Sequence, residues 1–126
     1  MRQYVVGALM VFASGLAALV PGGVANAQSG KPVRIIVAVP PGGTGDILGR
    51  LLAPLLTASW NAPVVIENRA GASGFIAAEA AAKAAPDGTT VFFSSAGIMA
   101  INPHMHAKLP YDPIRDYTPI AMLCVL

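Results

Sequence analysis

Apolar residues in this chain fall into short runs that alternate between strand-like and helix-like spacing. Val33–Val39 is a nearly continuous apolar, largely β-branched run, interrupted only by Arg34. Such a run is typical of a strand in a parallel sheet that is covered on both faces. Shorter runs of the same kind occupy residues 63–66 and 89–93. Because helical spacing separates the runs, the pattern predicts an α/β fold with a parallel sheet and flanking helices.

The segment after the first run has the spacing of an amphipathic helix. Asp46 is expected at the N-cap of this helix. Pro54 lies inside the pattern, where a proline removes a hydrogen bond and costs about 3 kcal/mol, so we expect a kink or an early end there. Six apolar side chains form one stripe of this helix: Ile47, Leu48, Leu51, Leu52, Leu55 and Leu56.

The second half of the chain continues the alternation less regularly. An alanine-rich helix is expected over residues 75–85, ended by the turn Pro86-Asp87-Gly88. A weaker helix is expected over 98–108, followed by a rigid loop over 109–113. Residues 120–126 are apolar and are expected to form a fourth strand. Because finished domains rarely stop inside a buried strand, we interpret the sequence as a piece of a longer reading frame.

Three turns rich in glycine and small polar residues follow the expected strands, at residues 40–46, 68–74 and 94–97. In open parallel sheets, ligands bind beyond the carboxyl ends of the strands. Backbone amides and hydroxyl groups at that edge could hold a carboxylate by neutral hydrogen bonds of about 1 kcal/mol each. The alternative is structural, since any α/β protein has small residues in such turns. The candidate ligand-binding residues are Pro41, Gly42, Gly43, Thr44, Gly45, Asp46, Gly71, Ala72, Ser73, Gly74, Ser94, Ser95 and Ala96.

The first of these turns is expected to lead the binding. The amides of Gly42 and Gly43 are expected to point at the acid group, aided by the partial positive charge of the following helix N-terminus. Asp46 has a functional interpretation, in which it receives a ligand ammonium or hydroxyl group or orders the loop, and a structural one as a helix cap. Arg69 either binds a ligand carboxylate or, as we favour, pairs with Glu67.

Catalytic, metal and nucleotide motifs do not accompany these turns in the sequence. Neither Ser94 nor Ser95 has a base at recognisable spacing, and the chain has no G-x-S-x-G motif. His104 and His106, without a nearby third ligand, make a poor zinc site. Gly49 comes one residue too late for a G-x-G-x-x-G fingerprint, and no phosphate-binding Gly-Lys-Ser/Thr follows. We therefore expect a binding protein that is not an enzyme and uses no metal or cofactor.

The N-terminus has the parts of a secretory signal peptide. Arg2 precedes an apolar run over residues 5–20, and small residues offer a cleavage site after Ala27. A membrane anchor is the alternative, but the run is short for a span of about 20 residues. We expect the mature protein to be exported. The expected divisions are a signal peptide (1–27), a linker (28–32) and a partial N-terminal α/β ligand-binding domain (33–126).

Charge and cysteine content narrow the expected partners. Without Arg2, seven basic and six acidic residues remain, a net charge of +1 with no cluster. This gives no electrostatic footprint for nucleic acid. Cys124 is the only cysteine, so no disulfide is expected, and its apolar surroundings favour a small buried hydrophobe.

The short motifs of the mature chain together form a family pattern. In chain order they are Pro32-Val33-Arg34-Ile35-Ile36-Val37, Pro41-Gly42-Gly43 with Asp46 and Arg50, Val64-Val65-Ile66-Glu67-Asn68-Arg69 with Gly71-Ala72 and Gly74, Ala85-Pro86-Asp87-Gly88-Thr89-Thr90, Asn102-Pro103, Leu109-Pro110-Tyr111-Asp112-Pro113 with Asp116, and Thr118-Pro119-Ile120-Ala121. With them the chain resembles the Bug family, the periplasmic solute receptors of tripartite tricarboxylate transporters. The resemblance covers essentially all of residues 32–126.

This resemblance implies a periplasmic-binding-protein-like, two-domain Venus-flytrap receptor of about three hundred residues. The present sequence would be its signal peptide and most of the first half of domain one, without the second domain. It also implies a monomer that captures a small carboxylate and delivers it to the membrane subunits of the transporter. Strand–turn–helix pincers hold the carboxylate in this family: the first corresponds to Pro41–Asp46, and Gly71–Gly74 and Ser94–Ala96 would line the same cleft. Gly45 departs from the pattern, which more often has a threonine directly before the aspartate, and this puts one hydroxyl contact in doubt.

Two alternatives stay open at this point. The chain is either a receptor component or a truncated, non-functional remnant of one. An exported α/β hydrolase-like enzyme is less well supported, because it would need a base near Ser94 or Asp46 and the sequence shows none. We expect a chain that holds the carboxylate from one side to bind it weakly, since the carboxylate stays in water.

Overall fold

The structure, a computed structural model, describes residues 30–123. The expected signal peptide, the first two residues of the linker (28 and 29) and Cys124 lie outside the described residues. The elements, in chain order, are β1 (Val33–Val37), α1 (Thr44–Trp60), β2 (Val64–Asn68), η1 (Ala72–Gly74), α2 (Phe75–Ala82), β3 (Thr90–Phe93), η2 (Gly97–Ile101) and α3 (Asn102–Met105).

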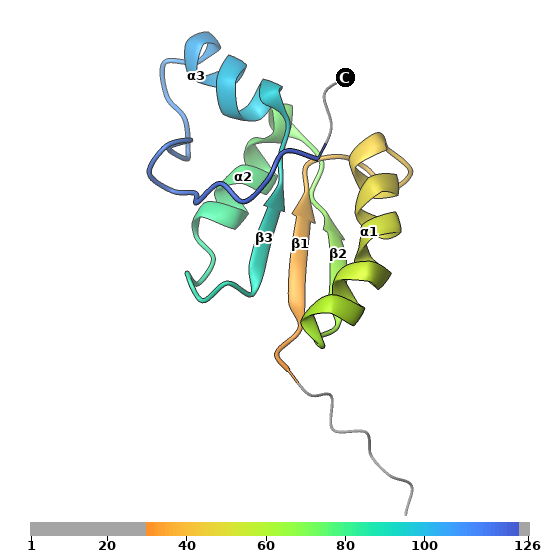
Figure 1. Cartoon of the computed structure of the whole chain (residues 1–126). Helices are drawn as coiled ribbons and strands as arrows, with labels where there is room; N and C mark the ends of the chain where they lie inside the picture. The colour runs from red at the N-terminus through yellow and green to blue at the C-terminus, as the bar shows by residue number, and fades with distance from the viewer. Residues whose placement is uncertain (1–29, 124–126) are drawn as a thin grey trace, which may run out of the picture.

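The three strands form one parallel sheet in the order β2-β1-β3. Ile35 of the central strand pairs with Ile66 on one side and with Val91 on the other. Figure 1 shows α1 beside β2 and α2 beside β3, with β1 between them. Ile36 and Val37 are completely buried, which agrees with a central strand covered on both faces. The predicted parallel α/β sheet is thereby confirmed, and the first three predicted strands are found within two residues of their expected limits.

Helix α1 begins earlier and continues further than expected. Its N-cap is Gly43, so Asp46 lies inside the first turn and the expectation that it caps the helix is wrong. The helix also continues past Pro54 to Trp60, which contradicts an early end. A proline removes one hydrogen bond, and packing of α1 on β2 outweighs that loss. Asn61 follows as the C-cap of the helix, and its left-handed conformation (φ 48°) commonly terminates helices.

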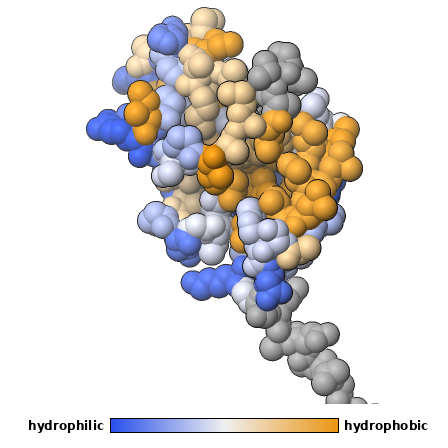
Figure 2. Space-filling view, in the orientation of Figure 1, coloured by the Kyte–Doolittle hydropathy of each residue, from blue (hydrophilic) through white to orange (hydrophobic). Residues whose placement is uncertain are grey.

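Only one half of the expected apolar stripe of α1 packs against the sheet. Gly49 is buried directly on the side chain of Ile66. Ile47, Leu51 and Leu55 instead lie on the outer side, with 51%, 65% and 68% of their surface exposed. Figure 2 shows an apolar region on the side of the molecule where α1 lies. The sequence pattern therefore overestimates how much of this helix the described residues cover.

The later elements are shorter than expected. Helix α2 ends at Ala82, and the expected helix over 98–108 is a π-helical turn, η2, followed by the four-residue α3. Residues 120–123, the described part of the expected fourth strand, are not in a strand, and 124–126 lie outside the described residues. No helix among residues 30–123 is long and apolar enough to cross a membrane.

A small second core joins these later segments to the sheet. Ala78, Ile98 and Tyr111 are buried together, and the Tyr111 hydroxyl donates to the Ile98 carbonyl at 2.5 Å. The Tyr117 hydroxyl donates to the carbonyl of Ala78 at 2.7 Å. This core fixes η2 next to the carboxyl end of β3, where the candidate site lies.

Candidate functional site

The turns after β1, β2 and β3 meet at the carboxyl end of the sheet around an open groove of about 430 Å³. The groove lies where the strand order reverses, with β2 on one side of β1 and β3 on the other. Open α/β sheets bind ligands at such a reversal. The described residues that line it are uncharged: Ala38, Pro40, Ala70, Gly71, Ser73, Gly74, Ser95, Gly97, Ile98 and Asn102.

The structure brings together only part of the candidate set. Four candidates line the groove: Gly71, Ser73, Gly74 and Ser95. Three others stand in the lining turns but are not among the described lining residues: Ala72, Ser94 and Ala96. The first turn reaches the groove only through Ala38 and Pro40, so the candidates over 41–46 lie off it.

The turn after β2 is the most unusual backbone of the site. Four consecutive residues have positive φ: Gly71 (120°), Ala72 (46°), Ser73 (54°) and Gly74 (87°). For the two that are not glycine, this conformation costs of order 1–3 kcal/mol each and persists only where the surroundings enforce it. Strained backbone of this kind is concentrated at ligand-binding sites.

Asn102 is the polar side chain of the groove that the sequence analysis missed. It is 8% exposed, and its Nδ2 donates to the Ser73 carbonyl at 3.0 Å. The dipeptide Asn102-Pro103 was part of the family pattern, yet no local spacing connects it to a residue 29 positions earlier. Only the folded chain places it against the turn.

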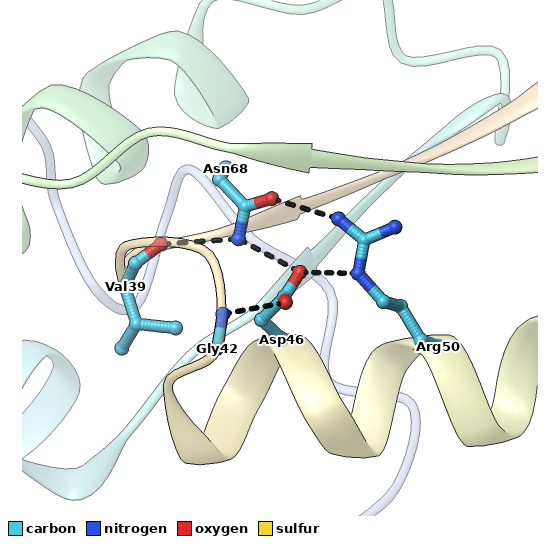
Figure 3. A network of polar contacts seen from close by, with 5 residues as sticks. All are labelled: Val39, Gly42, Asp46, Arg50 and Asn68. Atoms are coloured by element: carbon cyan, nitrogen blue, oxygen red, sulfur yellow. Dashed lines mark hydrogen bonds and ion pairs between the residues drawn. The ribbon is translucent and has the colours of Figure 1, made fainter.

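Asp46 is the centre of a polar network that orders the first turn (Figure 3). Its carboxylate is nearly buried and accepts from the Gly42 amide at 2.8 Å, Arg50 Nε at 2.9 Å and Asn68 Nδ2 at 3.0 Å. Asn68 Nδ2 also donates to the Val39 carbonyl. Asp46 thus joins the first turn, α1 and the end of β2. These contacts support its loop-ordering role.

This network also sets the charge state of Asp46. Hydrogen bonds from Arg50 and from the Gly42 amide lower the pKa of Asp46 from 3.8 to about 2, against the opposing effect of desolvation. The carboxylate is therefore ionised at all physiological pH values. With three donors already bound, it has little capacity left for a ligand ammonium group.

The two diglycine amides, which were expected to point at a ligand, are both bonded within the protein in this structure. The Gly42 amide donates to Asp46, and the Gly43 amide donates to the Pro40 carbonyl at 3.0 Å. The first helical hydrogen bond of α1 runs from the Ile47 amide to the Gly43 carbonyl. The amides of Thr44, Gly45 and Asp46 precede it, so these are the donors that the helix N-terminus leaves for an anion.

The remaining charged and polar candidates do not line the groove, and most of them contact other side chains of the protein. Arg69 pairs with Glu67, as favoured from the sequence, and Arg34 reaches the same carboxylate at 3.3 Å. The ring of His106 packs edge-on against Phe75. Across residues 30–123, no group of three or more His, Cys, Asp or Glu residues could hold a metal ion. The Ser94 hydroxyl oxygen is buried and has no hydrogen-bond partner among the described residues.

Comparison with known protein families shows which family this chain belongs to. The sequence profile of the "Tripartite tricarboxylate transporter family receptor" matches residues 27–125, which is well over half of the chain. The chain belongs to this receptor family. The resemblance to the Bug receptors is thereby confirmed.

Curated relatives of this receptor family are much longer than the present chain. Protein BugT of Bordetella pertussis is 37% identical over 123 residues. The match covers 97% of this chain and 37% of BugT. The chain therefore spans little more than a third of that relative's length.

Solved structures of similar receptors share the fold. MatC of Rhodopseudomonas palustris with bound malate has a TM-score of 0.70 at 35% identity, covering 74% of this chain and 32% of MatC. Rpa4515 of R. palustris with adipate has a TM-score of 0.62 at 40% identity, covering 66% of this chain and 28% of Rpa4515. The periplasmic-binding-protein-like fold expected from the sequence is confirmed for this part of the receptor.

Proposed function

We propose that this chain forms part of a periplasmic receptor that captures a small carboxylate for a tripartite tricarboxylate transporter. The observation that carries the proposal is the groove where the turns of three parallel strands converge. Membership of the receptor family supports the same function. Malate and adipate in two similar receptors support a small dicarboxylate as the ligand class.

The chemistry of the groove indicates how an acid would be held. Its described lining carries no charged side chain, so a carboxylate would be bound by neutral donors: the Ser95 hydroxyl and backbone N–H groups. Each such bond contributes about 1 kcal/mol net. Several must act together, which favours a ligand with two acid groups that reaches more than one turn.

The finer assignments belong to the same proposal. We place a signal peptide over 1–27 with cleavage after Ala27, a linker over 28–32 and part of the N-terminal ligand-binding domain over 33–126. The receptor acts as a monomer and passes its solute to the membrane subunits of the transporter. It performs no catalysis.

A thermal-shift screen tests the proposed function. The full reading frame that contains this sequence is heated with malate, adipate, citrate and nicotinate, and with adipamide as the uncharged counterpart of adipate. We expect at least one acid to raise the midpoint of unfolding, and adipamide to leave it unchanged. A screen in which no acid acts, or in which adipamide acts as strongly as adipate, would refute carboxylate capture.

The enzyme alternative is tested separately. A serine hydrolase needs a base within hydrogen-bond reach of its nucleophile, and the Ser94 hydroxyl has no such partner in the described structure. We expect no turnover of p-nitrophenyl acetate above the buffer rate. Turnover abolished by Ser94→Ala or Ser95→Ala would restore the enzyme interpretation.

A further inference from the structure

Two residues from one short segment hold the turn after β2 in place. Asn102 donates its amide to the Ser73 carbonyl at 3.0 Å. Ile98 lies so close to Gly74 that a Cβ at Gly74 would be 2.4 Å from Ile98 Cδ1. Ile98 and Asn102 are both buried, and they contact consecutive residues of the turn.

The geometry of η2 explains why both residues reach the same turn. In this π-helical turn the backbone N–H of Asn102 donates to the Gly97 carbonyl, five residues earlier. Ile98 and Asn102, four residues apart, therefore lie on one side of the turn. Tyr111 holds the N-terminal part of η2, because its hydroxyl donates to the Ile98 carbonyl. Single π-helical turns are frequent at functional sites.

The Ser73–Gly74 peptide group is consequently fixed at both ends. Its carbonyl accepts from Asn102, and its N–H donates to the Gly71 carbonyl at 2.9 Å. The plane of this peptide cannot rotate while both bonds persist. The next peptide group, Ala72–Ser73, is held as well, because its carbonyl accepts from the Phe75 amide. The two earlier amides of the turn, on Ala72 and Ser73, lie outside these bonds.

We infer that Asn102 is a positioning residue of the groove. Its side-chain amide holds the Ser73 carbonyl, keeps residues 71–74 in their strained conformation and so fixes the directions of the amides that the turn presents. The link from this turn to ligand affinity rests on the proposed function. The link from Asn102 to the conformation of the turn does not.

NMR spectra of the full reading frame that contains this sequence, recorded without ligand, test the conformational step. Asn102→Leu keeps a similar volume and removes the donor. We expect it to shift the amide peaks of Gly71 and Gly74 and to speed hydrogen exchange of the Gly74 amide at least tenfold. The matched control is His104→Leu, an exposed polar residue of the same helix, which should change neither. Wild-type exchange of the Gly74 amide in Asn102→Leu would overturn the inference.

A second variant keeps the test decisive if Asn102→Leu does not fold. Asn102→Asp has the same shape but carries an acceptor where the donor was. Near pH 7 its ionised carboxyl should displace the Gly71 and Gly74 peaks as Asn102→Leu does. When the introduced carboxyl is protonated below about pH 4, its O–H can donate to Ser73, and the peaks should return toward their wild-type positions. Peaks that stay displaced at low pH, while the rest of the spectrum is native, would contradict a donor role.

Calorimetry with malate and adipate on the full reading frame tests the functional step. Asn102→Leu should weaken whichever acid the wild type binds by at least tenfold, and His104→Leu should not. Unchanged affinity in an Asn102→Leu variant whose turn is loosened would overturn the positioning role. A wild type that binds neither acid would count against the proposed function, and the exchange measurement would still decide whether Asn102 holds the turn.

Discussion

Asp46 shows how one buried side chain can organise a glycine-rich turn. Glycine can adopt more backbone conformations than other residues and therefore loses more conformational freedom on folding. A glycine-rich turn thus needs contacts from elsewhere to fix its conformation. Asp46 supplies the constraint by accepting hydrogen bonds from Gly42 before it, Arg50 after it and Asn68 on the neighbouring strand. The carboxylate therefore acts on the first turn from inside the protein, and its effect on a ligand is indirect.

The lowered pKa of Asp46 predicts a pH dependence of stability. Its pKa is about 2 in the folded chain against 3.8 for the ordinary group. The stabilisation it provides is thus fully present above about pH 4 and is lost as the pH falls through 2. We expect Asp46→Asn to lower the unfolding midpoint at pH 7 and to flatten its decline below pH 4. Thermal unfolding at a series of pH values measures both effects.

Asp112 provides the control for that experiment. Its pKa is also lowered to about 2, chiefly by hydrogen bonds from Arg115, so the wild-type decline below pH 4 has at least two sources. Asp112→Asn should flatten the same region of the curve, and the double variant should flatten it more than either single one. Identical profiles for wild type and Asp46→Asn would show that the Asp46 network contributes no pH-dependent stability.

A pair of glycines separates backbone strain from steric clash. Gly42 and Gly74 have nearly the same φ, 84° and 87°, but a Cβ would meet nothing within 4 Å at Gly42 and would overlap Ile98 at Gly74. Gly42→Ala should cost about 1–2 kcal/mol through the left-handed backbone alone. Gly74→Ala should cost about 1–3 kcal/mol more, because it overpacks a buried contact. Urea unfolding measures both; equal costs would show that Ile98 can move aside.

At the scale of an element, the turn η2 depends on a hydroxyl group from outside it. In a π-helical turn the Ile98 carbonyl would accept from the amide of residue 103, which is a proline and has none. The Tyr111 hydroxyl takes that place at 2.5 Å, in a buried position. The Tyr in the Leu-Pro-Tyr-Asp-Pro motif thus compensates for the Pro in the Asn-Pro motif.

Removing this hydroxyl should destabilise the fold measurably. Tyr111→Phe leaves the buried Ile98 carbonyl without a donor, which costs about 1–3 kcal/mol. Tyr117→Phe is the matched control: the Ala78 carbonyl that Tyr117 contacts lies inside α2, whose own hydrogen bonds supply another donor. We expect the control to cost less than about 1 kcal/mol in urea unfolding. A larger cost for Tyr117→Phe than for Tyr111→Phe would contradict the role assigned to Tyr111.

How well each element could be predicted depends on how local its cause is. The strands follow from continuous apolar runs, so their order along the chain and their parallel arrangement were predictable. Asp46 was misplaced because a residue in the first turn and an N-cap look alike in sequence, and only its bond to Gly42 distinguishes them. Asn102 acts on Ser73 across 29 residues, and no periodicity records such a contact.

Over the whole molecule, the groove is bounded on one side and open on the other. A carboxylate held there keeps part of its hydration, and three neutral hydrogen bonds contribute about 3 kcal/mol in total. A dissociation constant of 1 mM requires about 4 kcal/mol. We therefore expect calorimetry on residues 28–126 to give dissociation constants for malate and adipate weaker than about 1 mM. The full reading frame, measured alongside, should bind at least one acid more tightly, because a second surface would exclude water and add donors. Micromolar binding by residues 28–126 would mean that the donors around Ser73 and Ser95 suffice by themselves, and that closure over the groove is not what gives this receptor its affinity.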